Sequence, residues 1–503
     1  MGGMNISRRW FIGGAASLGA LSGCRIITSS KGLLGGVPRI KFGVVSDIHV
    51  IAENTDRDGQ GNTRTFRRAL KWFDRQGVDA VMIAGDMADA GLLSQLQSVA
   101  DAWNAVFPGN RSRLDGRAVE KVFVYGNHDW EGYNYGYQIF GKPSKELTRD
   151  MICKIGTAKA WEEVFEEEYR NIYLKTIKGY QFIGGHWDPA NGSGWGKGPD
   201  LCAWMKDHGK EIDPSQPFFY VQHPHPKDTC YGSWAWGHDA GNTTKALSAF
   251  PNAIAFSGHS HYPLTDERSV WQGAFTSLGT GSLRYCAATY EEFADEGGYE
   301  NTKGGGKVRP DGGKLMPMPP LAEERNGYLV SVYDDCVVFN RRDFFADEEL
   351  GPDWIMPLPS AETKPFAFAE RAKKRFTPAF PASAAINIEK GEAETRDQRK
   401  ANEKLKKDAK PAKTAALVIT VPAAVETAAN RIHSYEITVE GAGKRIFRRV
   451  LSPSEHQPLS RAVKTIAVPV SLADLVPGDY TVTAVAIECF GHRSAALSQV
   501  VHI

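Results

Sequence analysis

The sequence lacks an excess of charge of either sign. Its 503 residues include 60 lysines and arginines and 59 aspartates and glutamates, which leaves a formal net charge of +1. A protein that grips duplex DNA or RNA neutralises many backbone phosphates and is usually strongly basic. We therefore expect no binding of duplex nucleic acid.

Cysteine is scarce, and its spacing excludes one common kind of metal or redox motif. None of the seven cysteines stands in a CxxC pair, so we expect no metal site built from cysteines. The six that follow Cys24 are Cys153, Cys202, Cys230, Cys286, Cys336 and Cys489. In an oxidising compartment six thiols allow about fifteen complete pairings. The sequence does not choose between these pairings, nor between disulfides and simple buried thiols.

The N-terminal apolar stretch is too short to cross a bilayer as a helix. It follows Ser7-Arg8-Arg9-Trp10-Phe11-Ile12 and ends at Leu21-Ser22-Gly23-Cys24. A basic pair before a short apolar stretch indicates a targeting signal. The paired arginines resemble a twin-arginine export signal, and the second motif resembles a bacterial lipoprotein cleavage box. These resemblances imply an exported protein, periplasmic or at the cell surface, with a lipid anchor at Cys24.

The length exceeds what one hydrophobic core usually supports, so we expect at least two domains. In the first part of the chain, short apolar runs alternate with stretches such as Phe66, Leu70 and Phe73, which share one helical face. This alternation predicts a layered α/β domain of mixed sheets flanked by helices. The apolar runs are 40–46, 80–84, 122–125, 182–184, 218–221 and 254–256, and a closing hairpin is predicted over 328–340.

The C-terminal part shows a different pattern. Alternating runs separated by turn signals predict a small all-β sandwich, and they lie at 417–421, 434–439, 465–470 and 480–487. Residues 475–482, followed by Phe490-Gly491, resemble the last strands of a fibronectin type III domain. The densely charged stretch 389–413 predicts a solvated loop or frayed helix. If 384–388 supplies the first strand, this stretch is an insertion rather than a linker.

These patterns together predict five consecutive parts. They are an export signal (1–24), a linker (25–38), the α/β domain (39–345), a connector (346–376) and the β-sandwich (377–503) with its charged insertion near 389–413.

Five short polar clusters each follow an apolar, strand-like run. They are Ser46-Asp47-Ile48-His49, Gly85-Asp86-Met87-Ala88-Asp89, Gly126-Asn127-His128-Asp129, Gln222-His223-Pro224 and Ser257-Gly258-His259-Ser260-His261. Functional groups gather at the carboxyl ends of strands in open α/β sheets. We therefore expect strands that are distant in the sequence to bring these clusters to one crevice.

The side chains in these clusters are oxygen and imidazole donors. Such a mixture suits two divalent transition metal ions, Mn, Fe, Zn or Ni, rather than Ca or Mg. If the backbone stays extended, alternation points both side chains of Asp47-x-His49, and of His259-x-His261, the same way. Two such pairs and a bridging carboxylate can hold two ions at the ~3.5–4 Å separation of two-metal hydrolysis.

Together the five clusters resemble the calcineurin-like metallophosphoesterase family over roughly residues 39–344. The resemblance implies two ligand sets that share Asp86 as a bridge, and its pattern favours His223 over His225. The two sets are Asp47, His49, Asp86 and His261 for one ion, and Asp86, Asn127, His223 and His259 for the other.

The resemblance also implies the catalytic roles. A metal-bridged hydroxide would be the nucleophile, and His128 would protonate the leaving oxygen as general acid. Asp89, the second acidic residue of its cluster, is the predicted partner that orients His128, with Asp129 as the alternative. Purple acid phosphatases place an iron-binding tyrosine where this chain has Asp89, so we expect no ferric-tyrosinate site.

The sequence therefore predicts an exported phosphoric ester hydrolase. Its phosphoester substrate is not identified, monoesterase and diesterase activity both fit, and the oligomeric state stays open. The alternative is a lipid-anchored, non-catalytic protein in which a decayed hydrolase domain and the sandwich recognise an envelope ligand. Because every ligand position of the family is occupied, we favour the enzyme.

Overall fold

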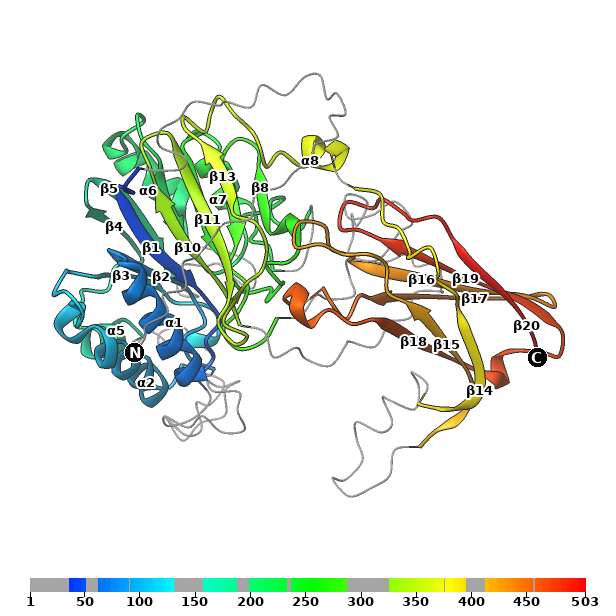
Figure 1. Ribbon diagram of the computed structural model, residues 1–503. Coiled ribbons are helices and arrows are strands. Elements are labelled where there is room, and N and C mark those ends of the chain that lie inside the picture. Colours follow the sequence, from blue (N-terminus) through cyan, green and yellow to red (C-terminus); the bar gives the residue numbers. More distant parts are fainter. Residues whose placement is uncertain are drawn as a thin grey trace, which may run out of the picture.

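In the computed structural model, an α/β region is followed by an all-β region (Figure 1). The residues that it describes are 36–50, 62–89, 91–130, 157–187, 199–232, 237–286, 325–374, 376–394, 412–455 and 457–503. The predicted export signal, Cys24 and Cys153 lie outside them. No helix within these ranges is both long and apolar enough to reach across a bilayer. The five cysteines that they include are all free thiols.

The first sheet of the α/β region has seven strands among the described residues. They are β1 (Ile40–Val45), β2 (Ala80–Ala84), β3 (Glu120–Val124), β10 (Asn326–Val332), β11 (Cys336–Asp343), β12 (Glu348–Glu349) and β13 (Trp354–Pro357). Their order is β12-β11-β10-β1-β2-β3, and β13 also pairs with β11. Since β1, β2 and β3 run parallel, their carboxyl ends lie at the same edge.

The second sheet is also mixed, and its described part has six strands. They are β4 (Ile172–Ile177), β5 (Tyr180–Gly185), β6 (Phe218–Val221), β7 (Ala253–Ser257), β8 (Val270–Gln272) and β9 (Thr276–Gly279). Their order is β4-β5-β6-β7-β9-β8, in which β5, β6, β7 and β9 run parallel. This sheet therefore also presents several carboxyl ends at one edge.

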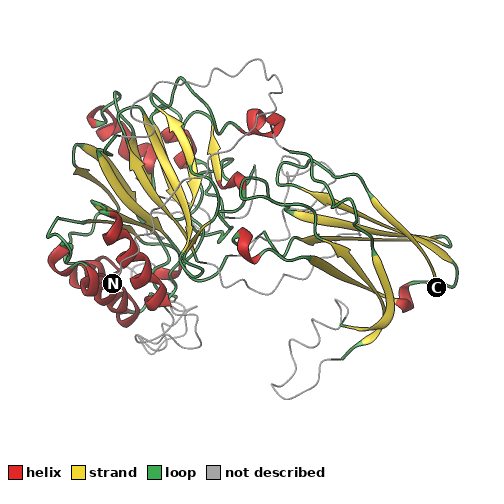
Figure 2. Cartoon of the chain, in the orientation of Figure 1, coloured by secondary structure: helices red, strands yellow, loops and turns green. Residues whose placement is uncertain are grey.

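The α/β region has four layers, in which two sheets pack face to face between two layers of helices. This is possible because successive side chains of a strand point to opposite faces of its sheet. The side chains of Ile40, Phe42 and Val44 face the second sheet, where Phe42 meets Phe182 and Phe219 edge-on. The opposite face of the first sheet packs against α1, α2 and α5, whereas α6 and α7 cover the second sheet (Figure 2). These helices are α1 (Asn62–Gln76), α2 (Leu93–Val106), α5 (Thr157–Phe165), α6 (Leu201–His208) and α7 (Asn242–Leu247). Strands covered on both faces explain the apolar runs in the sequence.

The all-β region has two antiparallel sheets that enclose one apolar core. Its strands are β14 (Asn387–Ala393), β15 (Thr414–Pro422), β16 (Ser434–Gly441), β17 (Lys444–Leu451), β18 (Thr465–Ser471), β19 (Asp479–Ile487) and β20 (Leu497–His502). The sheet orders are β14-β15-β18 and β17-β16-β19-β20. Helix α8 (Phe368–Lys374) lies between the two regions in the chain. The predicted fold class is therefore confirmed, while the fibronectin type III resemblance stays a prediction.

The charged stretch 389–413 differs from the prediction. Its first residues belong to β14, which pairs with β15, so this part is neither a loop nor a helix. β14 lies at the edge of its sheet and is mostly exposed, and charged side chains suit such an edge. The stretch thus connects two paired strands of one sheet, and residues 395–411 lie outside the described ranges.

Candidate metal centre

The predicted metal ligands follow strands from both sheets. Asp47, Asp86 and Asn127 come after β1, β2 and β3 of the first sheet. His223 and His259 come after β6 and β7 of the second. The two sheets pack face to face with these ends together, which is how residues far apart in the sequence become neighbours.

The backbone at several ligands is left-handed rather than extended. The φ angles are 52° at Asp47, 49° at His49, 52° at Asp86, 72° at His259 and 57° at His261. Residues other than glycine rarely adopt this conformation, and such strain clusters at functional sites. The premise that extended backbone aligns each pair of ligands is therefore wrong, because the chain turns at both members of each pair.

One group of donors consists of Asp47, His49 and His261, all of them buried. The Nε2 atom of His261 lies 3.0 Å from Oδ1 of Asp47 and 3.2 Å from Nε2 of His49. The backbone N–H of His259 donates to Oδ2 of Asp47 at 3.1 Å and fixes this carboxylate. The three donor atoms lie within 4.8 Å of one another, so one ion can contact them all.

A second group consists of Asp86, His223 and His259. The Nε2 atom of His223 lies 3.0 Å from Oδ2 of Asp86, 3.1 Å from Nδ1 of His259 and 3.0 Å from Oδ1 of Asn127. The same Oδ2 of Asp86 lies 3.5 Å from Nε2 of His49 in the first group. One carboxylate oxygen thus faces both groups, as a bridging ligand must.

The outer nitrogens of three histidines have oxygen partners. The Nδ1 atom of His223 lies 2.8 Å from the carbonyl oxygen of Ala84, and that of His261 lies 3.2 Å from the carbonyl oxygen of Tyr285. The Nδ1 atom of His49 lies 3.2 Å from Oδ1 of Asp89. Metal-binding histidines commonly donate their second N–H in this way, which leaves Nε2 free to bind the ion. The donor set therefore fits a pair of metal ions.

Electrostatics favour cations at this position. Burial opposes protonation of His49, but hydrogen bonds with two carboxylates outweigh it and raise its pKa to about 9. Burial is likewise outweighed at His223, whose pKa rises to about 9 beside Asp86. Burial, and then the charge of His223, lower the pKa of His259 to about 3. The buried carboxylates therefore attract positive charge, which two metal ions would supply.

The sequence of this region matches a known family. Residues 40–263 match the family described as calcineurin-like phosphoesterase. Residues 40–263 form a calcineurin-like phosphoesterase domain. This match confirms the domain predicted from the five clusters over these residues. The phosphoesterase sheets continue beyond the matched residues, because β10 pairs with β1 and β9 pairs with β7.

The solved structures to which this chain is similar are distant from it in sequence. A dimetal phosphatase from Danio rerio is 12% identical, with 64% of this chain and 99% of that chain covered and a TM-score of 0.36. The purple acid phosphatase PPD1 from yellow lupin is 11% identical, with 65% and 55% covered and a TM-score of 0.39. A comparison with curated proteins finds no match.

The predicted general acid of the phosphoesterase domain, His128, lies beside the first donor group. Its ring centroid is 4.5 Å from that of His49. The Nδ1 atom of His128 lies 2.8 Å from the backbone carbonyl oxygen of Asp89. The backbone carbonyl of Asp89 therefore orients His128, whereas its carboxylate, the predicted partner, contacts His49. The alternative, Asp129, accepts hydrogen bonds from backbone N–H groups, including that of Ala88 at 2.7 Å.

One residue at the centre was not predicted. The Arg284 guanidinium forms an ion pair with Asp89, and the Arg284 side chain is 23% exposed. Arg284 follows β9 in a loop that also carries Ser282, whose hydroxyl lies 3.2 Å from the carbonyl oxygen of Asp47. The sequence gives no signal for it, because a lone arginine in a loop belongs to no motif.

Two other buried histidines of the phosphoesterase domain, His225 and His186, contact serine hydroxyls, backbone and aromatic rings of the fold. The Nδ1 atom of His225 lies 2.7 Å from the hydroxyl of Ser257, and its Nε2 atom lies 2.7 Å from the hydroxyl of Ser260. His186 accepts a hydrogen bond from the backbone of Tyr125 at 3.0 Å and lies among aromatic rings. The placement of His225 agrees with the choice of His223 as the ligand.

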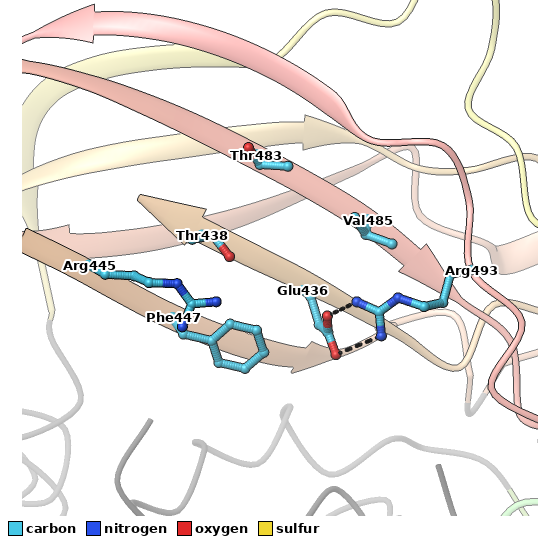
Figure 3. A pocket seen from close by; sticks show the side chains of 7 residues that line it. All are labelled: Glu436, Thr438, Arg445, Phe447, Thr483, Val485 and Arg493. Carbon is cyan, nitrogen blue, oxygen red and sulfur yellow. Dashed lines mark hydrogen bonds and ion pairs between the residues drawn. The ribbon is translucent and has the colours of Figure 1, made fainter. Parts of the chain in front are cut away.

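A separate pocket lies on the all-β region (Figure 3). It has a volume of about 350 Å³ and opens on one face of β16, β17 and β19. It contains none of the predicted ligands. Its polar groups include Arg493, which pairs with Glu436 across the pocket. The lining residues are Glu436, Thr438, Arg445, Phe447, Thr483, Val485 and Arg493.

Proposed function

We propose that the chain is an exported, lipid-anchored, dinuclear metal-dependent hydrolase of phosphate mono- or diesters. The observation that carries the proposal is the pair of buried donor groups that meet at one oxygen of Asp86. They lie in a calcineurin-like phosphoesterase domain. The substrate is a phosphoester of unassigned identity, because metal ligands alone do not distinguish monoesters from diesters.

The proposed ligands are those of the two donor groups, completed by Asn127. When bound, two ions such as Mn, Fe, Zn or Ni acidify a water molecule and neutralise negative charge on the phosphoryl group. The position three residues beyond Asp86 is Asp89 rather than tyrosine. We therefore propose a centre without ferric tyrosinate.

The proposed role of His128 is to protonate the leaving oxygen. Its Nδ1 can donate to the carbonyl oxygen of Asp89, which orients the ring and leaves Nε2 to carry the transferred proton. The Asp89 carboxylate instead holds His49 and Arg284. We therefore propose Asp89 as a positioning residue whose carboxylate acts through His49.

The substitution His128→Ala tests the enzymatic role. Purified protein with added Mn is expected to hydrolyse p-nitrophenyl phosphate or bis-p-nitrophenyl phosphate. The variant is expected to lose about 10² to 10⁴-fold in kcat, because a general acid contributes that much, and to keep its bound metal. His502→Ala, at an exposed histidine of β20, is the control and should retain full activity.

The alternative function makes the opposite prediction. A binding protein with a decayed hydrolase domain would hold metal yet turn over neither substrate, and His128→Ala would change nothing. Metal-dependent turnover that depends on His128 would exclude this alternative. Comparing nucleotides, cyclic nucleotides, sugar phosphates and phospholipid head groups would then identify the substrate class.

The proposed location has its own test. Cys24→Ser removes the atom that would be lipidated, so the protein should move from the membrane fraction to a soluble fraction. Replacing Arg8-Arg9 with two lysines should retain the protein inside the cell. Unchanged fractionation of both variants would contradict the proposed anchor and export signal.

A further inference from the structure

A second cluster of metal-binding side chains lies where the α/β and all-β regions meet. Asp266, His433 and Glu455 offer donor atoms that lie within 4.8 Å of one another, and all three residues are buried. Asp266 precedes the short helix η7 (Glu267–Ser269) and β8. His433 directly precedes β16, and Glu455 follows β17. The cluster therefore draws its members from both regions of the chain.

The regions touch at this cluster. The hydroxyl of Thr265, next to Asp266, donates to the backbone carbonyl of Glu455. Nearby, Tyr231 and Tyr262 pack in one apolar cluster with Leu451 of β17. These contacts seal the side chains from water, so whatever neutralises them must be part of the folded structure.

Glu455 makes the cluster unusual. Its residue exposure is 1%, and neither carboxylate oxygen has a hydrogen-bond partner among the described residues. A buried carboxylate without partners is costly, and such a group in a native protein calls for an explanation such as a bound ion. Burial, reinforced by the charge of Asp266, holds the pKa of Glu455 well above its usual range.

The surrounding arginines do not complete the charge balance. Arg268 pairs with Asp266 through two nitrogens, and Arg431 pairs with Glu426 at 3.2 Å. The charges of Arg268 and Arg431 also act on Glu455. Two arginines against the three carboxylates of Asp266, Glu426 and Glu455 still leave one negative charge in excess. A cation bound by Glu455, His433 and Asp266 would satisfy both oxygens of Glu455, whereas a single proton would give a contact to only one.

We propose that Asp266, His433 and Glu455 form a third metal site, separate from the phosphoesterase centre, that joins the two regions. Two carboxylates and one imidazole suit zinc or another divalent transition metal ion. Donors around a tetrahedral zinc lie about 3.4 Å apart, so small side-chain rotations close the site around an ion. Arg268 holds the carboxylate of Asp266 in place, as outer partners of metal ligands do.

The test separates this site from the phosphoesterase centre by removing the latter. A variant with Asp47→Asn, Asp86→Asn, His223→Ala and His261→Ala loses two of the three donors of each phosphoesterase group, the proposed bridge included. After equilibration with Zn²⁺ and removal of excess ion, this variant should retain about one zinc per chain by elemental analysis. Adding Glu455→Gln should abolish that zinc. Since no activity is measured, the result does not depend on the proposed hydrolase function.

Glu455→Gln keeps the side-chain shape and removes a buried charge, so it should fold, which thermal unfolding checks. The control Glu348→Gln alters another contact between the regions, the 2.6 Å hydrogen bond from Ser460, and should leave the zinc in place. Zinc that survives Glu455→Gln would overturn the proposal. A complete absence of zinc in the variant without the phosphoesterase ligands would also overturn it. That result is expected if Glu455 and Asp266 share a proton and bind no ion.

Discussion

At the scale of single residues, the metal centre depends on glycines that leave room for its ligands. A Cβ atom on Gly85 would lie 2.5 Å from Nδ1 of His223, and one on Gly126 would lie 2.2 Å from Oδ1 of Asp86. Gly85 also has a φ of 86°, a conformation that favours glycine. The glycines before Asp86 and Asn127 are thus a steric requirement of the centre.

We therefore expect Gly85→Ala to displace His223 and to lower both kcat/KM and bound metal. A misplacement of about 1 Å can cost about 10²-fold in rate, and a loss of this size is expected on bis-p-nitrophenyl phosphate. Gly179→Ala is the matched control, because Gly179 has the same φ of 86° and nothing within 4 Å of an added Cβ. Equal losses of activity in the two variants would attribute the effect to backbone strain and contradict this account.

A second prediction at this scale concerns acid stability. Burial, helped by the charge of Lys175, lowers the pKa of His186 from 6.5 to about 3. Below pH 6.5 His186 is therefore protonated in the unfolded chain, whereas it stays neutral in the folded chain until the pH approaches 3. The contribution of His186 to the free energy of unfolding is fully present above pH 6.5. It is lost as the pH falls towards 3, by up to about 1.4 kcal/mol per pH unit.

The variant His186→Gln does not titrate and can still accept the hydrogen bond from the backbone of Tyr125. Urea unfolding at pH 7, 6, 5 and 4 should show a shallower fall in the free energy of unfolding for the variant than for the wild type. Parallel profiles would show that His186 does not carry this acid sensitivity. Titration of the metal ligands is common to both proteins and cancels in the comparison.

At the scale of elements, the two sheets of the phosphoesterase region are joined through aromatic packing. Phe42 of β1 is fully buried, and its ring lies 5.2 Å from Phe182 of β5 and 4.7 Å from Phe219 of β6. Phe42→Ala should cost about 3–5 kcal/mol, because the cavity lies between two sheets that cannot collapse easily. Val37→Ala, at a side chain 86% exposed, should change stability by less than about 0.5 kcal/mol. Chemical unfolding measures both, and a cost near that of the control would contradict the sheet-joining role.

The elements differ in how readily the sequence predicts them. β2 and β6 are buried on both faces and appear in the sequence as uninterrupted apolar runs. The apolar residues of α1 recur with helical spacing, so this helix could be predicted equally well. In β17, four basic residues dilute the apolar signal, and β20 is mostly exposed, so neither was predicted. Burial produces the pattern that sequence reasoning detects, and strands at the surface carry less of it.

The residues of the metal centre also differ in how readily the sequence predicts them. The ligand clusters could be predicted because each follows a buried strand. The contact between the Asp89 carboxylate and His49 could not, because it depends on how two loops turn after their strands. Arg284 was missed for the same reason, since its approach to Asp89 is set by the fold and not by neighbouring residues.

At the scale of the whole molecule, the contact between the two regions is the feature furthest from the sequence pattern. Leu451 ends β17 and is 4% exposed, because it packs with Tyr231 and Tyr262 of the phosphoesterase region. Arg371 of α8 adds a contact, with its guanidinium carbon 5.4 Å from the ring centroid of Phe490. Such packing should make the two regions unfold together.

We therefore expect Leu451→Asp to uncouple them. The substitution buries a charge without a partner, which costs several kcal/mol, and the cost falls on the contact between the regions. Calorimetry should then resolve two transitions in place of one. Val500→Asp, at a side chain 62% exposed on β20, introduces the same charge away from this contact and should preserve a single transition. If Leu451→Asp also unfolds in one transition with an unchanged Tm, the contact does not couple the regions.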